Sequence, residues 1–327
     1  MKSKAIFIGS EENIAKAYGE KIRTLLCRQL EFSDKPYTRD ELKNESCKKE
    51  LRETEYIFST WGMAELSEQE ISGIFPALKA VFYAAGTVQS FARPFLNRGV
   101  RIFSAWGANA IPVAEFTVAQ IVLANKGYFH ALTNNTSVSH CGNYNTSVGI
   151  IGAGMIGTLV IKMLKDYQLN VKVFDPFLSE EKAKELGVEK VGALTELFEK
   201  CHVISNHLAN NPQTVGMIDR RCFDKMEDSG VFINTGRGQQ IVEADMIEAL
   251  KAEPSRIALL DVTYPEPPSK DSELYTLPNV FLSPHIAGSI GNEVQRMGEF
   301  MYDEFIRLTD GKPLKYEVTT EMLKTMA

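Results

Sequence analysis

Short hydrophobic runs bounded by turn-forming residues alternate with longer, partly polar stretches along the first hundred residues of the chain. Runs of this length are typical of buried β-strands, and the stretches between the first three are long and polar enough for helices. Alternating strands and helices favour a parallel sheet, because a parallel crossover needs a dozen or more residues. The predicted strands are 5–8, 56–59, 78–84 and 101–104.

The same rhythm begins again after residue 146, with six further predicted strands at 147–151, 171–174, 203–205, 231–233, 257–260 and 280–282. At 327 residues the chain is long enough for two domains. The pattern predicts an α/β protein with two Rossmann-like, doubly wound parallel-sheet domains and an interdomain cleft. We expect a substrate-binding domain at 1–104, completed by 291–327, and a nucleotide-binding domain at 105–290.

Two helical segments join these domains. Residues 109–129 are strongly apolar and begin with Asn109, which can cap a helix, followed by Pro112 in the expected first turn. Apolar residues cover more than one face of this segment, so it is either an interdomain helix that lines a dimer interface or the core helix of its own domain. A long helix after residue 292 is expected to pack on the first domain, and 133–146 is expected to be a loop.

Composition narrows the choice of partner. The chain is 44% hydrophobic and 24% charged with a net charge of −6, which gives no general attraction to nucleic acid or to an anionic membrane and favours a small molecule. No secretory signal is evident, and no run approaches the roughly eighteen uncharged apolar residues of a membrane span, so we expect a cytoplasmic protein. The cysteines suggest neither a disulfide framework nor a metal site, because they are odd in number, widely spaced and without a CxxC pair. They are Cys27, Cys47, Cys141, Cys201 and Cys222.

A GxGxxG stretch at 152–157 follows the predicted strand 147–151 and precedes an apolar helical segment. The motif alone is a weak signal, but strand, loop and helix in this order are typical of a dinucleotide site. Gly152 allows the tight turn, Gly154 lets the backbone approach a pyrophosphate, and Gly157 brings the helix against the strand. The free N–H groups at the start of the helix then face the phosphates.

Asp175 follows the second strand of this domain, eighteen residues after Gly157. An acidic side chain there accepts hydrogen bonds from the adenosine ribose and repels the 2′-phosphate of NADP. The next residues are Pro176 and Phe177, so no arginine is at hand to bind that phosphate. NAD is the expected cofactor. The alternative is an aspartate that only forms a turn before proline.

Three groups of complementary chemistry follow predicted strands closely: Arg237, Glu266 and His285. Reduction of a 2-keto acid needs a cation for the carboxylate, a proton donor for the carbonyl oxygen and a hydride. An arginine and a histidine supply the first two, and a glutamate on the far ring nitrogen orients the imidazole. Singly, each could be an ordinary surface charge or loop residue. Ligands of open α/β sheets, however, bind at the carboxyl ends of the strands, where all three are expected.

These residues stand in the stretches Asn-Thr-Gly-Arg-Gly (234–238), Asp-Val-Thr-Tyr-Pro-Glu-Pro (261–267) and Ser-Pro-His-Ile-Ala-Gly (283–288). Together with the glycine-rich loop and 109–115, they resemble the D-isomer-specific 2-hydroxyacid dehydrogenase family, which includes D-glycerate, D-lactate and phosphoglycerate dehydrogenases. The resemblance implies His285 as acid/base, Glu266 as its partner and Arg237 as substrate anchor. It also implies catalysis in the interdomain cleft and a homodimer built on the cofactor domains.

Further site residues are expected from the same resemblance. The expected substrate contacts, besides Arg237, are Ser59, Thr60, Trp61, Gly62, Ala85 and Gly86. The expected cofactor contacts, besides the three glycines and Asp175, are Met155, Ile156, His207, Thr235, Gly236, Gly288 and Asp261, the last near the nicotinamide carboxamide. The chain departs from the family pattern at 207–209, where His-Leu-Ala replaces the usual His-Leu-Pro.

The loop 58–63 contains no lysine or arginine, which favours a small unphosphorylated keto acid of the glyoxylate or hydroxypyruvate type over a phosphorylated one. Branched 2-keto acids stay open, and Trp61 either packs beneath the loop or lines the pocket. One alternative function is a non-catalytic, NAD(H)-responsive regulatory protein on the same fold. Another is a phosphite-type dehydrogenase. A formate dehydrogenase is disfavoured, because that branch typically has Gln in place of Glu266.

Overall fold

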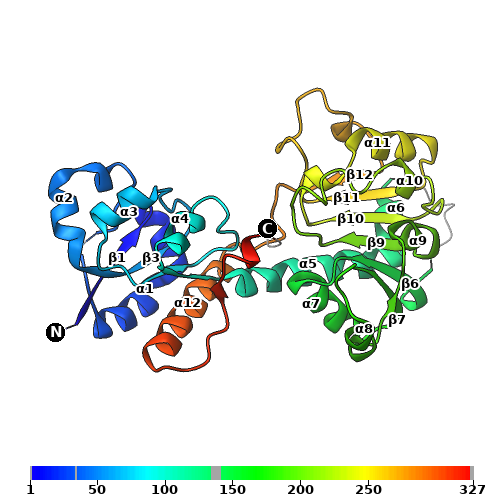
Figure 1. Cartoon of the computed structure of the whole chain (residues 1–327). Helices are drawn as coiled ribbons and strands as arrows, with labels where there is room; N and C mark the ends of the chain where they lie inside the picture. Colours follow the sequence, from blue (N-terminus) through cyan, green and yellow to red (C-terminus); the bar gives the residue numbers. More distant parts are fainter. Residues whose placement is uncertain (1, 34, 134–140, 325–327) are drawn as a thin grey trace. The chain divides into compact units, whose positions relative to one another are not determined.

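The computed structural model describes residues 2–33, 35–133 and 141–324. The chain divides into two compact units, which are considered separately (Figure 1). Unit 1 consists of Met1–Asn109 and Ser289–Ala327, and unit 2 of Ala110–Gly288. Each unit contains one sheet. The domain limits expected from the sequence, 104 and 291, lie a few residues from these divisions.

Unit 1 is built on a six-stranded sheet of order β13-β5-β4-β3-β1-β2. The four predicted strands are confirmed as parallel neighbours: β1 Ser3–Ile8, β3 Thr54–Ser59, β4 Ala80–Tyr83 and β5 Arg101–Ser104. Two short edge strands were not predicted, parallel β2 (Leu30–Phe32) and antiparallel β13 (Glu317–Val318). With three and two residues they are too short for an alternating pattern to show.

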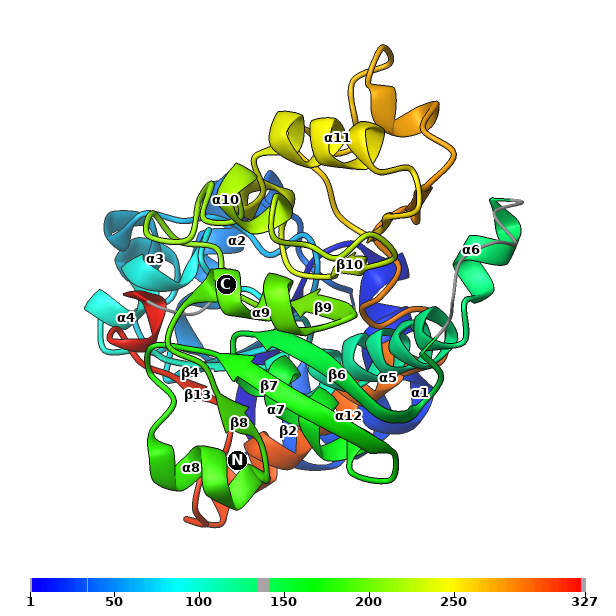
Figure 2. The same cartoon turned by 90° about the vertical axis from the view of Figure 1, so that its right-hand side faces the viewer.

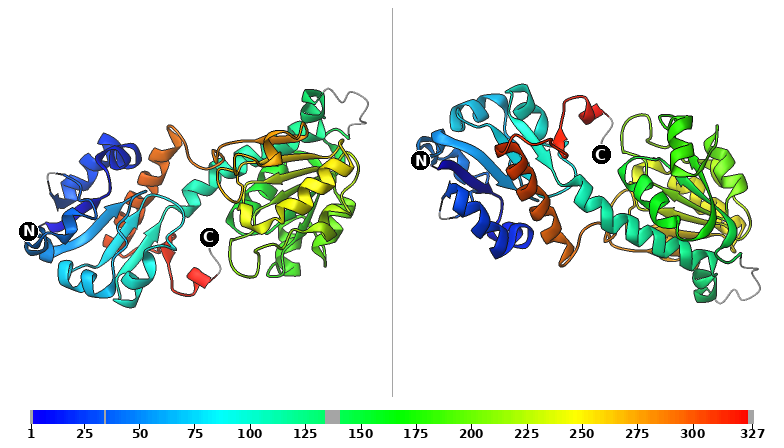
Figure 3. Two further views of the ribbon diagram at one scale, coloured as in Figure 1. Left: turned by 90° about the horizontal axis from the view of Figure 1, so that it is seen from above. Right: turned by 90° about the horizontal axis from the view of Figure 1, so that it is seen from below.

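Helices cover both faces of this sheet. Alternate strand residues such as Phe7, Phe58 and Phe82 pack with α1 (Glu11–Gln29) and α12 (Glu293–Thr309). The other face packs against α2 (Glu45–Glu50), α3 (Glu68–Ile74), α4 (Ala92–Asn97) and the 3₁₀ turns Glu41–Lys43, Leu51–Glu53 and Met322–Lys324. The predicted C-terminal helix is confirmed: α12 packs against α1, and Figure 3 shows it in orange-red within unit 1.

Helix α5 (Trp106–Asn125) begins before its predicted start. Asn109 is therefore not its N-cap: its backbone N–H already donates to Ala105 O at 3.0 Å, and Pro112 lies inside the helix. The segment also ends early, because Gly127 takes a left-handed conformation (φ 72°) before a separate helix, α6 (Tyr128–Leu132). Ala108 belongs to the core of unit 1, and Ala114, Ile121 and Ala124 belong to the core of unit 2, so α5 runs from one unit into the other, as the interdomain interpretation expected, and is a core helix as well.

Among the described residues, α5 is the one helix long and apolar enough to cross a membrane by length and composition. This is weak evidence for a span, because the core helix of a soluble protein passes the same test, and more than half of the apolar window is buried inside the protein.

Unit 2 contains a seven-stranded parallel sheet of order β12-β11-β10-β9-β6-β7-β8. All six predicted strands are confirmed, and the two-residue β8 was not predicted. The loop expected at 133–146 is wrong at its end, where Tyr144–Thr146 already belong to β6, and 134–140 lie outside the described residues. The strands are β6 Tyr144–Ile151, β7 Gln168–Phe174, β8 Glu189–Lys190, β9 Val203–Asn206, β10 Val231–Asn234, β11 Ile257–Leu260 and β12 Val280–Leu282.

Both faces of the unit 2 sheet are covered by helices (Figure 2). One core layer contains α5, α7 (Met155–Leu164) and α8 (Glu180–Leu186). The opposite layer contains α9 (Leu194–Lys200), α10 (Arg220–Phe223), α11 (Glu243–Ala252) and the 3₁₀ turns Gly238–Gln240 and Glu273–Tyr275. The strand order reverses at β6, so β6 and β9 are the neighbours whose following connections diverge to opposite faces, as in dinucleotide-binding folds.

We predict that Gly298→Ala destabilises unit 1 by about 1–3 kcal/mol, as overpacking of a core does. A Cβ at Gly298 of α12 would lie 2.1 Å from Ala17 O of α1, and backbone cannot give way as a flexible side chain can. Gly73→Ala in α3 is the matched control, because nothing lies within 4 Å of a Cβ at this position. Alanine there should increase the free energy of unfolding by at most about 1 kcal/mol. Urea denaturation followed by circular dichroism measures both. Equal midpoints for Gly298→Ala and the wild type would contradict the close approach of the two helices.

Candidate active site

The glycine-rich loop between β6 and α7 has the geometry that its sequence predicts. Gly152 has a φ of 87°, which side chains rarely allow. A Cβ at Gly157 would lie 2.0 Å from Gly152 O, so only glycine lets α7 start so close to β6. At Gly154, by contrast, a Cβ would meet nothing within 4 Å. Gly152 and Gly157 are therefore required by the backbone geometry, whereas the Cβ position of Gly154 is open.

The N-terminus of α7 can bind a phosphate group. Gly154 is the N-cap of α7 and offers no side-chain cap, so the first N–H groups of the helix, at Met155 and Ile156, are available to an anion. A pyrophosphate at this place would gain those donors and the helix dipole. The glycine at 154 leaves room for it.

Asp175, directly after β7, supports the same loop. Its Oδ2 accepts a hydrogen bond from Ala153 N at 2.7 Å, and its Oδ1 accepts one from Phe177 N at 2.8 Å. The second contact is the turn that the alternative interpretation expected. Asp175 thus forms a turn and also ties β7 to the glycine-rich loop, with carboxylate lone pairs left for ribose hydroxyls.

His207 lies against this loop: a Cβ at Gly152 would come within 3.0 Å of His207 O. Its ring is buried, with Nε2 3.0 Å from Ser205 Oγ, and Nδ1 has no hydrogen-bond partner within the described part of the chain. Burial lowers the pKa of His207 to about 3, so the imidazole is neutral at physiological pH. An unpartnered buried nitrogen next to the glycine-rich loop is consistent with the expected cofactor contact.

Arg237 follows β10 in a turn held by a buried amide network. Asn206 Nδ2 donates to Asn234 Oδ1 at 2.9 Å and to Gln240 Oε1 at 2.7 Å. Gln240 Oε1 also accepts from Arg237 N at 3.1 Å, and Asn234 Oδ1 accepts from Gly236 N at 3.1 Å. Neither asparagine nor Gln240 was singled out from the sequence, although a polar residue ending a buried strand, as both asparagines do, is a usable signal. Next to Gly236, Thr235 is buried with Oγ1 3.3 Å from Thr117 Oγ1.

The Arg237 turn packs against the segment that leads to Glu266. A Cβ at Gly238 would lie 2.0 Å from the carbonyl carbon of Thr263, so the two backbones touch. Burial lowers the pKa of the Arg237 guanidinium from its ordinary value, while the negative charge of Glu266 acts in the opposite direction. One guanidinium nitrogen, Nη1, donates to Gly236 O at 2.8 Å. The remaining N–H groups can bind an anion.

Glu266 and His285 form a direct pair, with Glu266 Oε1 2.5 Å from His285 Nδ1. Their side chains are 40% and 47% exposed, so a ligand can reach them. A carboxylate only accepts hydrogen bonds, so Nδ1 carries a proton and Nε2 is left to exchange one with a ligand. His285 also has a φ of 54°, a conformation that is uncommon for a residue other than glycine.

Asp261 at the end of β11 fixes the loop that carries His285. Its Oδ1 accepts from Ser283 Oγ at 2.5 Å and from Ile286 N at 2.9 Å, and its Oδ2 accepts from Ala287 N at 2.9 Å. His285 N donates to Asp261 O at 3.0 Å. With 3% exposure this carboxylate is almost completely enclosed. This positioning role was not foreseen from the sequence, and the expected contact with the nicotinamide carboxamide stays a prediction.

The expected substrate residues of unit 1 lie where β3 and β4 end. The hydroxyls of Ser59 and Thr60 are buried and donate to backbone, to Ile8 O at 2.6 Å and to Ala84 O at 2.8 Å. Ser104 Oγ donates to Ala85 O at 2.9 Å and to Gly86 O at 2.5 Å.

The tip of this loop differs from its buried base. The Trp61 side chain is 41% exposed, and Gly62 has a φ of 95°. Within the described residues, the N–H groups of Trp61 and Gly62 donate to no other group. At this loop the backbone N–H groups of Trp61 and Gly62, and not the hydroxyls of Ser59 and Thr60, are therefore free for a ligand.

A Rossmann-type unit with an Arg, Glu and His set at the carboxyl edge of its sheet defines a class of nucleotide-dependent oxidoreductases. Residues 122–287 match the model of the D-isomer specific 2-hydroxyacid dehydrogenase NAD binding domain. The chain belongs to this family. The matched region contains Arg237, Glu266, His285 and all of the expected cofactor contacts except Gly288, and NAD is its cofactor.

Individual relatives agree with this assignment. The chain is 32% identical over 229 residues to D-3-phosphoglycerate dehydrogenase of Archaeoglobus fulgidus, covering 68% of this chain and 43% of that protein. It is 30% identical over 223 residues to the enzyme of the same name from Methanocaldococcus jannaschii, covering 66% of this chain and 42% of that protein. In both cases the chain spans less than half of the relative's length.

Solved structures share the fold. D-mandelate dehydrogenase of Rhodotorula graminis, in an apo form, aligns with a TM-score of 0.80 and 20% identity over 98% of each chain. A phosphoglycerate oxidoreductase from Rhizobium etli aligns with a TM-score of 0.79 and 19% identity, over 98% of this chain and all of that one.

We predict that His207 makes unit 2 less stable as the pH falls below about 6.5. The unfolded chain takes up a proton on this ring near pH 6.5, whereas the folded protein resists it until about pH 3. Above pH 6.5 the His207 ring does not reduce the free energy of unfolding. Below pH 6.5 the free energy of unfolding falls by up to about 1.4 kcal/mol per pH unit, because the unfolded chain binds one more proton. Urea denaturation between pH 7 and pH 5, above the range of most carboxylates, should show a shallower pH dependence for His207→Gln. Identical slopes for the two proteins would contradict the neutral buried ring.

Proposed function

We propose that this chain interconverts a 2-keto acid and a D-2-hydroxy acid by hydride transfer with NAD. The observation that carries the proposal is the Glu266–His285 pair, 2.5 Å from oxygen to nitrogen, together with the nearby, partly buried guanidinium of Arg237. All three follow strands of the cofactor-binding sheet. A proton donor and a carboxylate-binding cation at the carboxyl edge of such a sheet are what keto-acid reduction requires.

The roles follow from the contacts. Arg237 binds the substrate carboxylate through guanidinium N–H groups other than the Nη1 bond to Gly236 O. In the reducing direction His285 Nε2 donates a proton to the carbonyl oxygen, and in the oxidising direction it takes the proton back. Glu266 stabilises the charged ring through Nδ1 and fixes its orientation. The bound cofactor supplies or accepts the hydride.

A small unphosphorylated substrate of the glyoxylate or hydroxypyruvate type is part of the proposal. The 58–63 loop carries no lysine or arginine, and what its tip offers is the two N–H groups of Trp61 and Gly62, which suit a carboxylate. The relatives named for 3-phosphoglycerate make a phosphorylated substrate the competing choice. A homodimer and a cytoplasmic location, expected from the sequence, stay predictions.

The test is NADH oxidation by the purified protein with glyoxylate, hydroxypyruvate, pyruvate, 2-ketoisocaproate and phosphohydroxypyruvate, with NADPH in parallel. We expect the highest kcat/KM with NADH and an unphosphorylated acid. Preference for phosphohydroxypyruvate would overturn the substrate choice but keep the reaction. NADH binding with no turnover on any acid would favour the regulatory alternative, and NAD reduction by phosphite would favour the phosphite-type dehydrogenase.

We predict that His285→Ala lowers kcat by about two to four orders of magnitude, as loss of a general acid/base does, while NADH binding measured by fluorescence is unchanged. Glu266→Gln should lower kcat less, because it keeps a side-chain oxygen but loses the charge that stabilises the protonated ring. Glu273→Gln, also an exposed carboxylate of unit 2, is the matched control and should leave kcat as it is. Unaltered turnover in His285→Ala would refute the assigned role.

A further inference from the structure

A second cluster of chemically active side chains lies in unit 2, away from the residues discussed so far. Cys141, His202 and Glu227 each offer one ligand atom, and these atoms all lie within 4.8 Å of one another. The three residues come from distant parts of the sequence: Cys141 lies shortly before β6, His202 directly before β9, and Glu227 in the turn before β10. No short spacing motif connects them, which is why the cysteines did not suggest a metal site in the sequence.

The imidazole of His202 is the centre of this cluster. The residue is only 4% exposed, and its Nδ1 lies 2.5 Å from Glu227 Oε1. Nδ1 therefore faces the Glu227 carboxylate, and it is the ring atom that an ion shared with Glu227 would bind in place of the proton that now joins the two groups.

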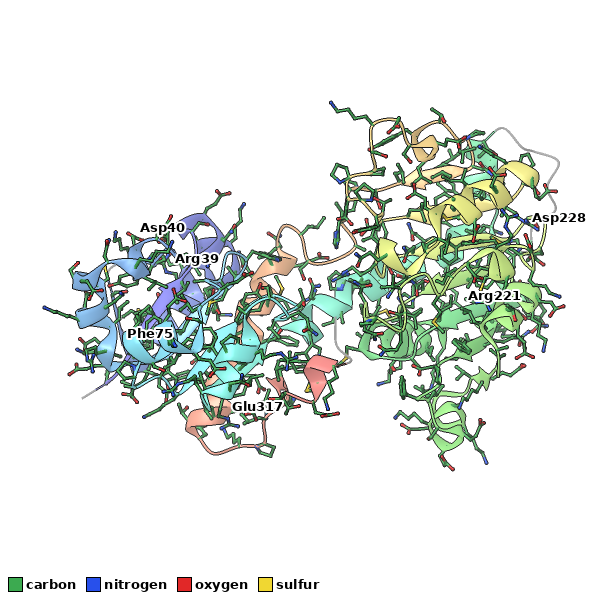
Figure 4. All side chains as sticks on the ribbon, turned by 45° about the horizontal axis from the view of Figure 1, so that its top comes forward. Arg39, Asp40, Phe75, Arg221, Asp228 and Glu317 are labelled. Carbon is green, nitrogen blue, oxygen red and sulfur yellow. The ribbon has the colours of Figure 1, made fainter. Side chains whose placement is uncertain are left out.

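The cluster lies at the edge of the sheet opposite the catalytic residues. His202 precedes β9 and Glu227 precedes β10, whereas Asn206 and Arg237 end or follow the same strands. A four-residue strand is roughly 13 Å long at 3.3 Å per residue. The cluster and the catalytic residues therefore lie at opposite ends of the strands. Figure 4 labels Asp228, the neighbour of Glu227, at the margin of unit 2. The cluster is thus no part of the oxidoreductase site.

We propose that Cys141, His202 and Glu227 bind Zn²⁺ or a divalent cation of the same ligand preference. Sulfur, nitrogen and carboxylate oxygen are the donors that Zn²⁺ takes in proteins, and water completes four ligands. On binding, the metal would form bonds to the Cys141 sulfur, His202 Nδ1 and a Glu227 oxygen, while the thiol proton passes to solvent and the imidazole proton shifts from Nδ1 to Nε2. The ion would cross-link the three segments that lead into β6, β9 and β10, so we assign it a structural role in unit 2.

Cobalt(II) added to the full-length, metal-free protein tests this directly, because thiolate ligation gives Co²⁺ an intense charge-transfer absorption in the near ultraviolet. We expect this band in the wild type with one equivalent bound, its loss in Cys141→Ser, and its retention in Cys27→Ser, the control at an exposed cysteine. Glu227→Gln should keep the band and bind Zn²⁺ roughly tenfold or more weakly in competition with a chelator, as loss of a ligand group does.

Zn²⁺ should also raise the thermal midpoint of the wild type and of Cys27→Ser but not that of Cys141→Ser. Both serine variants can be checked for folding by circular dichroism without metal, so a loss of binding is not confused with unfolding. No charge-transfer band in the wild type would overturn the proposal. A band of equal strength in Cys141→Ser would do the same, because it would place the thiolate at another cysteine.

Discussion

The arrangement of the proposed active site depends above all on one buried carboxylate. Asp261, at the end of β11, accepts hydrogen bonds from Ser283, Ile286 and Ala287 and receives the N–H of His285 on its own carbonyl oxygen. The loop after β12 is thereby tied to the neighbouring strand on both sides of His285. The left-handed backbone of His285 is held by these bonds, and the ring meets Glu266 as a consequence. Without the Asp261 carboxylate, the loop that carries His285, the proposed acid/base residue, would lose three hydrogen bonds.

Some side chains near the proposed site hold the backbone of its loops and are also expected ligand contacts or neighbours of one. Asp175 accepts from the backbone of the glycine-rich loop and is also the expected ribose contact, and Gln240 accepts from Arg237 N and from the side-chain amide of Asn206. Substitutions at such residues alter loop geometry along with ligand binding. Their effects on activity cannot be attributed to a lost ligand contact alone.

Much of this architecture could be predicted because its signals are local. Strands such as β4 and β9 are continuous apolar runs, and the GxGxxG loop lies between a strand and a helix. The edge strands β2, β8 and β13 could not be predicted, since two or three residues carry no periodicity. The start of α5 was wrong because Asn109 does not cap the helix: its Oδ1 accepts from Ser289 N, 180 residues away, and the helix continues through Pro112. The anchoring role of Asp261 and the Cys141, His202 and Glu227 cluster arise from contacts between distant segments, which no spacing in the sequence reveals.

The loop that follows β3 has a consequence for how selectivity could change in this protein. Its two hydroxyls are committed to internal backbone acceptors, and its free donors at Trp61 and Gly62 belong to the main chain. In the proposed site, anion binding by main-chain donors would not depend on which side chain occupies position 61. Replacement of the exposed indole would leave these donors in place, so a single substitution there could alter which acids fit without removing the anion contact.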